Sequence, residues 1–263
     1  MRVTTIFPAA GRSTRFGDTD KLAAELDGRP LLLRAVEAFA RRPEVHQLIV
    51  AGPPDDLDRF RSRFGDALSF LGATIVAGGR AERWETVRAA LESVGTDATH
   101  IAVHDAARPM PDSGMLDRVF EAAQHVDAVV PGVPVTDTLK RVDVAAASTT
   151  PRDEDDVLAD AILGNDPAAS TPLHPVIETM DRSGVHRIQT PQVFAADLLR
   201  RAYAEEAMPA GVTDDAAAVE RLGSPVHVVE GDPWNVKVTT PEDLTLVRAL
   251  WSERSAHAPT SLF

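Results

Sequence analysis

The sequence predicts an α/β fold built on one mostly parallel sheet. Two observations carry this prediction. Short apolar runs, mostly rich in valine or isoleucine, alternate with amphipathic helical stretches along nearly the whole chain. Strands covered by helices on both faces have such a composition, because neither face meets water. With 263 residues, of which 44% are hydrophobic, the chain is long enough to bury a sizeable core.

The predicted strands are short and apolar over most of their length. They comprise residues 3–7, 47–51, 74–77, 100–103, 127–131, 226–229 and 236–239. Between them, apolar residues recur at the three- and four-residue spacing of core-facing helices. These helices are expected at residues 31–40, 57–64, 85–94, 115–124, 196–207, 215–222 and 241–251. The last begins Thr240-Pro241-Glu242-Asp243, which combines an N-cap candidate, a proline at the first helical position and acids at the positive end of the helix dipole.

One segment interrupts this alternation. Residues 142–181 carry nine acidic residues and one basic residue, so they supply −8 of the formal net charge of −13. The segment has several prolines and no clear period, which indicates an exposed arm. We expect residues 136–142 to leave the sheet and 185–189 to return to it. The chain is then one domain over 1–263, with an arm at 136–190 that contains the acidic insertion.

Composition excludes several classes of protein. There is no cysteine, so disulfide frameworks, thiolate zinc sites, iron–sulfur clusters and a cysteine nucleophile are impossible. The excess of 40 acidic over 27 basic residues argues against a broad nucleic-acid surface. The chain has no signal-peptide segment and no stretch near the ~18 apolar residues of a membrane helix. We expect a cytoplasmic protein with no nucleic-acid or membrane partner.

Ligands of open parallel sheets bind beyond the carboxyl ends of the strands, so the loops after the strands are the first candidates for a site. The first loop, residues 8–21, has small residues followed by Arg12, Arg15 and Lys21. Small side chains let backbone N–H groups approach a phosphate chain, and the cations neutralise its charge. The loop lacks both the dinucleotide and the Walker fingerprints. A tight turn with solvated cations explains it equally well.

Two further loops offer a glycine pair and a carboxylate. In residues 77–86 a glycine pair precedes a helix, where it suits either a flat base or an ordinary strand-to-helix turn. In residues 103–109, Asp105 follows a buried strand, where a carboxylate can hold Mg²⁺ bound to phosphate oxygens. The alternative is that Asp105 caps a turn or pairs with Arg108. His104 is a weaker candidate, because the histidines show no metal-ligand spacing.

Lys237 lies between two valines in the last predicted strand. Alternation places its side chain on the opposite face from both valines. This cation therefore points either into a cleft or, if the strand is at an edge, into solvent.

Taken in order, these segments resemble the 2-C-methyl-D-erythritol 4-phosphate cytidylyltransferases of the sugar-nucleotidyltransferase superfamily. The resemblance covers nearly the whole chain. The matching residues are Pro8-Ala-Ala-Gly11 with Arg15 and Lys21, Gly79 with Glu82, Arg83 and Thr86, residues 103–109, Asp137-Thr138 with Lys140-Arg141, Asp181-Arg182, Thr190-Pro-Gln192, Thr213-Asp214 and Asn235-Val-Lys-Val-Thr239.

The resemblance implies a doubly wound, mostly parallel, Rossmann-like nucleotidyltransferase sheet with a protruding dimerisation arm. It implies transfer of CMP from CTP to 2-C-methyl-D-erythritol 4-phosphate, with release of pyrophosphate, in non-mevalonate isoprenoid synthesis. The implied catalytic residues are Arg15, Lys21 and Lys237, with Mg²⁺ at Asp105. The implied nucleotide contacts are Pro8, Ala9, Ala10, Gly11, Arg12, Gly79, Arg80, Thr86 and Asp105. The implied contacts of the sugar phosphate are Asp105, Arg108, Thr138, Arg182, Thr190, Thr213 and Lys237, and the implied partner is a second copy of the chain.

Two positions depart from the family's pattern. Arg80 stands where the family often has a second glycine, and the arm is longer than the family's usual excursion. The matching position of Arg182 reaches the neighbouring subunit's substrate in relatives. Two other functions remain open on the sequence: a cytidylyltransferase that uses ribitol 5-phosphate, and a catalytically silent nucleotide-binding homologue.

Overall fold

The computed structural model describes residues 1–11, 16, 20–149, 172–204 and 212–257. It divides into two compact units, of which the first comprises Met1–Val133 and Ile188–Phe263 and the second Pro134–Arg187. In the described part of the chain, no helix combines the length and apolar character needed to cross a membrane.

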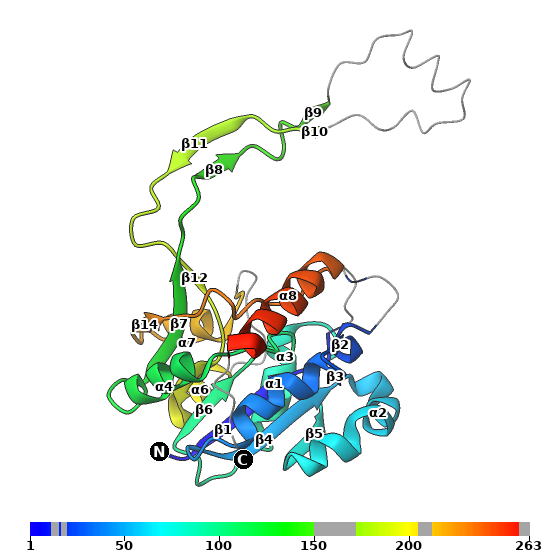
Figure 1. Ribbon diagram of the computed structural model, residues 1–263. Helices are drawn as coiled ribbons and strands as arrows, with labels where there is room; N and C mark the ends of the chain where they lie inside the picture. The colour runs from blue at the N-terminus through cyan, green and yellow to red at the C-terminus, as the bar shows by residue number, and fades with distance from the viewer. Residues whose placement is uncertain (12–15, 17–19, 150–171, 205–211, 258–263) are drawn as a thin grey trace, which may run out of the picture. The chain divides into compact units, whose positions relative to one another are not determined.

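The first unit is built on a mixed, mostly parallel sheet (Figure 1). Its strands are β1 (Val3–Pro8), β4 (Val45–Gly52), β5 (Ala73–Ala77), β6 (His100–Val103), β7 (Ala128–Pro134), β12 (His186–Ile188), β13 (Gln192–Ala195) and β14 (His227–Glu230). The order is β12-β7-β13-β6-β1-β4-β5, and β14 also pairs with β7. Strands β5, β4, β1 and β6 are parallel, whereas β13 runs antiparallel to both β6 and β7.

Helices cover both faces of this sheet. They are α1 (Leu31–Ala40), α2 (Leu57–Phe70), α3 (Arg83–Leu91), α4 (Ser113–Ala122), α6 (Ala196–Ala202), α7 (Asp215–Glu220) and α8 (Pro241–His257). Apolar residues of α1, α2 and α4 share one core cluster with Phe7 of β1, while those of α3, α6 and α7 share a second with Ile6. Neighbouring residues of one strand thus enter different clusters, as strand alternation requires. The predicted α/β fold with a doubly wound sheet is confirmed.

Small elements complete the first unit. Helix η2 (Lys21–Ala23) and the pair β2 (Glu25–Leu26) and β3 (Arg29–Pro30) precede α1, and η3 (Pro54–Asp56) precedes α2. A third apolar cluster packs α8 through Leu244 and Val247 onto Leu31 and Val238. The predicted start of α8 is confirmed, because Thr240 Oγ1 accepts from Asp243 N–H and the Asp243 carboxylate accepts from Thr240 N–H.

Two sequence predictions about strands are wrong. Residues 236–239 do not form a strand; the backbone of Val238 bonds instead to Ala107, in the loop after β6, where no strand is available for pairing. Strand β13 is missing from the prediction, because its four residues lie directly before α6 and resemble the beginning of that helix.

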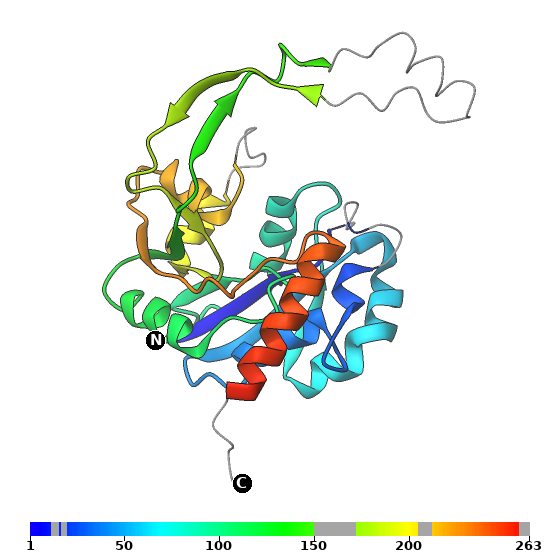
Figure 2. The ribbon, with the colours of Figure 1, turned by 45° about the horizontal axis from the view of Figure 1, so that its top comes forward.

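The second unit contains paired antiparallel strands (Figure 2). Strand β8 (Leu139–Val142) pairs with β11 (Val176–Met180), and β9 (Ser148–Thr149) pairs with β10 (Pro172–Leu173). This unit comprises Pro134–Arg187, and the sequence predicts an arm at residues 136–190. Much of the predicted acidic insertion, residues 150–171, lies outside the described residues.

Candidate active site

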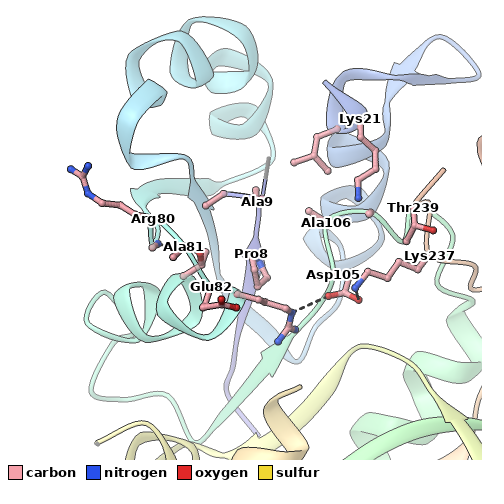
Figure 3. Close-up of a pocket in the computed structure, with 17 residues that line it drawn as sticks. Pro8, Ala9, Lys21, Arg80, Ala81, Glu82, Asp105, Ala106, Lys237 and Thr239 are labelled. Carbon is pink, nitrogen blue, oxygen red and sulfur yellow. Dashed lines mark hydrogen bonds and ion pairs between the residues drawn. The ribbon is translucent and has the colours of Figure 1, made fainter. Parts of the chain in front are cut away.

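A cleft of about 490 Å³ opens in the first unit beyond the carboxyl ends of β1, β5 and β6 (Figure 3). Its lining comprises Pro8, Ala9, Ala10, Gly11, Lys21, Leu22, Gly79, Arg80, Ala81, Glu82, Arg83, Thr86, Asp105, Ala106, Ala107, Lys237 and Thr239. The volume is in the usual range of small-molecule sites. Sequence segments that are far apart along the chain therefore meet where parallel sheets bind ligands.

Backbone and small side chains form one wall of the cleft. Parallel pairing continues past the strands, since Ala9 N–H donates to Ala51 and Gly78 N–H donates to Gly52, each at 2.8 Å. This holds residues 8–11 beside the turn that follows β5. Ala9 and Ala10 bring little side-chain volume, and a Cβ at Gly11 would meet nothing within 4 Å. Backbone groups in this wall are thus open to a ligand.

The turn between β5 and α3 tolerates only glycine at two positions. A Cβ on Gly78 would lie 2.7 Å from Thr86 Cγ2, and one on Gly79 would lie 2.3 Å from Glu85 Cβ. Gly79 N–H donates to Thr86 Oγ1 at 3.1 Å. Helix α3 begins with a capping box between Glu82 and Glu85. The glycine pair therefore brings the turn tightly onto the first turn of α3.

Arg80 follows this glycine pair without filling the cleft. Its side chain is 75% exposed, and its guanidinium pairs with Asp55 at 2.5 Å. Figure 3 shows the side chain directed away from Lys21 and Asp105. The arginine that replaces the family's usual glycine thus leaves the space beside Gly79 open.

Charged side chains form the opposite wall, around Asp105. The Asp105 side chain is 10% exposed, and three cations contact it. Lys237 Nζ lies 2.9 Å from Oδ2, Arg108 Nε 3.3 Å from Oδ2, and Arg83 Nε 3.3 Å from Oδ1. Burial alone raises the pKa of Asp105, but the charges of Arg83, Lys237 and Arg108 outweigh it and hold the pKa well below its usual value. Asp105 is therefore ionised at any physiological pH.

The loop that carries Asp105 is held by His104 and Thr190. Asp105 N–H donates to Thr190 Oγ1 at 3.0 Å, and Thr190 Oγ1 lies 3.2 Å from His104 Nδ1. His104 Nε2 lies 3.0 Å from the Arg108 carbonyl oxygen. The ring is fully buried beside Phe7 and Phe39, and burial lowers the pKa of His104 to about 4. A neutral ring that donates from Nε2 and accepts at Nδ1 satisfies these contacts together.

The remaining predicted site residues do not line the cleft or lie outside the described residues. Arg108 is not among the lining residues and donates to the Asn235 carbonyl oxygen at 2.7 Å from behind Asp105. Thr190 is buried under the same loop, and Thr213 is exposed just before α7. Thr138 and Arg182 are exposed residues of the second unit. Arg12 and Arg15 lie outside the described residues.

Lys237 and Lys21 are the cations of the cleft that the sequence predicted. Lys237 lines the cleft although its segment is not a strand, because the buried Val238 beside it packs against α8 and turns the lysine to the other side. Lys21 begins η2, which Asp20 caps by accepting from Leu22 N–H at 3.1 Å.

Arg83 is a cleft-lining cation to which the residue-by-residue prediction gave no role. Besides contacting Asp105, its guanidinium lies 2.8 Å from Asp215 Oδ2 at the start of α7. The Glu82-Arg83 match contained this signal, but Asp215 lies too far along the chain for spacing to reveal the pairing.

Comparisons with known proteins assign the family. The family model of IspD, 2-C-methyl-D-erythritol 4-phosphate cytidylyltransferase, matches residues 3–160 and 160–253. A protein of that name from Frankia casuarinae is 39% identical over 95% of this chain and 81% of its own length, and one from Rhodopirellula baltica is 36% identical over 95% of both. The crystal structure of the Thermus thermophilus protein has a TM-score of 0.67 at 31% identity, over 96% of this chain and 100% of that one. The chain belongs to the 2-C-methyl-D-erythritol 4-phosphate cytidylyltransferase family.

Proposed function

We propose that this protein transfers CMP from CTP to the phosphate of 2-C-methyl-D-erythritol 4-phosphate and releases pyrophosphate, a step of isoprenoid precursor synthesis. One observation carries the proposal: Lys21, Lys237 and Asp105 line the same cleft as the open backbone of residues 8–11. The family membership supports the same reaction.

The backbone wall suits both parts of a nucleotide. We infer that the triphosphate lies against Pro8, Ala9, Ala10 and Gly11, whose small side chains let it approach the backbone, with Lys21 and the predicted Arg12 and Arg15 as its cations. The cytosine then lies against Gly79 and Thr86. The hydroxyl hydrogen of Thr86 is available to a base, because its oxygen serves as the acceptor of Gly79 N–H.

The transfer needs no general base. An oxygen of the acceptor phosphate attacks the α-phosphorus of CTP and forms the new P–O bond. The bond from that phosphorus to the bridging oxygen breaks, and the electron pair leaves with pyrophosphate. A phosphate monoester has a second pKa near ~6, so at neutral pH it is largely a dianion and already nucleophilic. Lys21 and Lys237 then lower the barrier by neutralising the crowded anionic charge.

Asp105, which three cations contact, is the residue of the cleft that would hold a magnesium ion brought in with the nucleotide. Among the described residues no group of three acidic or histidine side chains gathers, and in the cleft lining Glu82 is engaged in capping α3. Asp105 is thus the carboxylate that remains, and Mg²⁺ is commonly held by one carboxylate together with substrate phosphates. When bound, the ion supplies charge neutralisation at the phosphate oxygens.

The acceptor contacts of Arg108, Thr138, Arg182, Thr190 and Thr213 stay predictions from the family resemblance. For Thr190 the structure favours an indirect role, since its hydroxyl already contacts Asp105 N–H and His104.

We also propose that two copies of the chain pair through the second unit. Strand β11 exposes Val176, Ile177 and Met180, and Val142 of the paired β8 is exposed as well. Exposed apolar residues at such density are typical of an interface. Light scattering of the full chain tests this: a dimer is expected, and a fully active monomer contradicts it.

The reaction is tested by pyrophosphate release from CTP and Mg²⁺, with 2-C-methyl-D-erythritol 4-phosphate and ribitol 5-phosphate offered separately. ATP, GTP and UTP serve as controls for the base. We expect release only with CTP and the methylerythritol acceptor. Release with ribitol 5-phosphate alone assigns the other acceptor, and silence with both contradicts catalysis.

A further inference from the structure

The guanidinium of Arg83 joins two carboxylates that come from different parts of the first unit. Its Nε lies 3.3 Å from Asp105 Oδ1, and an Nη lies 2.8 Å from Asp215 Oδ2. Arg83 begins α3, Asp105 follows β6, and Asp215 begins α7. Because both ends of the planar guanidinium are occupied, its orientation is fixed by two partners at once.

Asp215 is itself fixed. Its side chain is fully buried, and Tyr203 Oη donates to its second oxygen, Oδ1, at 2.6 Å. Tyr203 is 4% exposed at the end of α6. Burial, and then the charge of Asp215, raise the pKa of Tyr203 well above its usual value, so the hydroxyl remains a donor at all physiological pH values. Buried Tyr203 and Asp215, together with the partly exposed Arg83, form a chain of contacts that ends on Asp105.

The cations on Asp105 therefore differ in their freedom. Arg83 contacts Oδ1 and is held from behind, whereas Lys237 contacts Oδ2 with a side chain that is 40% exposed in the cleft. Lys237 has a flexible stem and a single charged centre, so it can turn toward an incoming phosphate. Without Arg83, Oδ1 of Asp105 would have no cation, whereas Oδ2 would keep Arg108 and Lys237, so the carboxylate could turn with the lysine and keep it from the substrate.

We propose that Arg83 is a positioning residue for the transfer: anchored by Asp215 and Tyr203, it holds the Asp105 carboxylate in place while Lys237 turns to the substrate phosphates. This inference rests on the proposed function, which it deepens. In this proposal Arg83 acts through Asp105, because its Nε contacts Asp105 and one Nη contacts Asp215.

The test must separate positioning from folding, because Arg83→Gln alone leaves the buried Asp215 without its cation, which is destabilising. The double variant Arg83→Gln/Asp215→Asn removes both charges together. Tyr203→Phe removes only the hydroxyl behind Asp215. Arg88→Gln, on the same helix, is the matched control, since its guanidinium stacks on Trp84 instead.

We expect the double variant to lose ~10- to 100-fold in kcat, the usual effect of removing a group that orients a ligand, with KM for CTP changed by less than about threefold. Tyr203→Phe should lose several-fold, and Arg88→Gln should stay within about twofold of wild type. In an Asp105→Asn background the same double substitution should cost less than about threefold, because the residue through which it acts is already altered. The proposal is overturned if the double substitution lowers kcat as much in the Asp105→Asn background as in the wild type. It is also overturned if the losses of kcat among the variants simply parallel their losses of melting temperature.

A crystal structure of the Arg83→Gln/Asp215→Asn variant tests the proposal without an activity assay, through the position of the Asp105 carboxylate. We expect the Asp105 carboxylate to have turned from its present position toward Lys237. An unmoved carboxylate overturns the role of Arg83. A wild-type protein that releases no pyrophosphate overturns the proposed function instead, and this structure still decides whether Arg83 holds Asp105.

Discussion

The two walls of the cleft differ in what they use to meet a ligand. Residues 8–11 and the Gly78-Gly79 turn present backbone and little side-chain volume, whereas the wall around Asp105 presents charged side chains whose partners are largely buried. The first wall depends on small side chains that leave room for a ligand, and the second on charged side chains that contact it. Added volume should therefore damage one wall, and removed charge the other.

The largest effect is expected from removing a cation of the charged wall. Lys237→Ala or Lys21→Ala should lower kcat by ~10²- to 10³-fold, because a preorganised group that neutralises transition-state charge is lost. The measurement is pyrophosphate release at saturating CTP, with Arg61→Ala on the exposed face of α2 as control. Near-normal turnover of either lysine variant contradicts its role.

The next effect is a pH dependence of the free energy of unfolding, caused by the buried His104 ring that holds the Asp105 loop. The pKa of His104 is about 4 in the fold and near 6.5 in the unfolded chain, so below pH 6.5 the unfolded state binds the extra proton. The free energy of unfolding should fall by up to ~3 kcal/mol as the pH decreases from 6.5 to 4. The lowered pKa of Asp105 acts in the same direction only below about pH 4.

Urea unfolding at pH 7 and pH 4.5 measures this dependence. A His104→Gln variant lacks the titrating ring, and its stability should fall less between the two values. An equal fall in both proteins shows that His104 is not the group responsible.

The backbone wall is tested by adding one methyl group at either of two glycines. Gly79→Ala places a Cβ against Glu85, which should destabilise the fold by ~1–3 kcal/mol and raise KM for CTP. Gly11→Ala meets no atom of the protein, so it should raise KM for CTP and leave the melting temperature unchanged. If the two variants melt alike, the turn at Gly79 is not as closely packed against Glu85 as described.

The smallest effect is expected at Arg80. Its exposed guanidinium pairs with Asp55, and the side chain is directed away from the cleft. Arg80→Ala should change kcat/KM for CTP by less than about threefold, since exposed ion pairs contribute little. A loss of tenfold or more would make Arg80 a nucleotide ligand.

The backbone wall could be predicted from the sequence more fully than the charged wall. Small residues and glycines next to a strand are local signals, and Pro8–Gly11 and Gly79 do line one cleft. Alternation left Lys237 pointing either into a cleft or into solvent, and it lines the cleft although residues 236–239 form no strand. The contact of Arg83 with Asp215 joins residues far apart in the sequence, so no spacing could predict it. Strand β13 was missed for a related reason: its antiparallel place depends on two neighbours, β6 and β7, and not on its own four residues.

Backbone hydrogen bonds join the two chain segments at which the second unit begins and ends. In the first unit, Gln189 N–H donates to the Pro131 carbonyl oxygen at 2.8 Å. In the second unit, Val135 N–H donates to the Val185 carbonyl oxygen at 3.0 Å. The chain between these bonds begins and ends at neighbouring places, and closing a longer loop costs little more than closing a shorter one. We therefore expect insertions and deletions between these bonds to leave the register of β7 unchanged, so that the arm can change in length without altering the cleft.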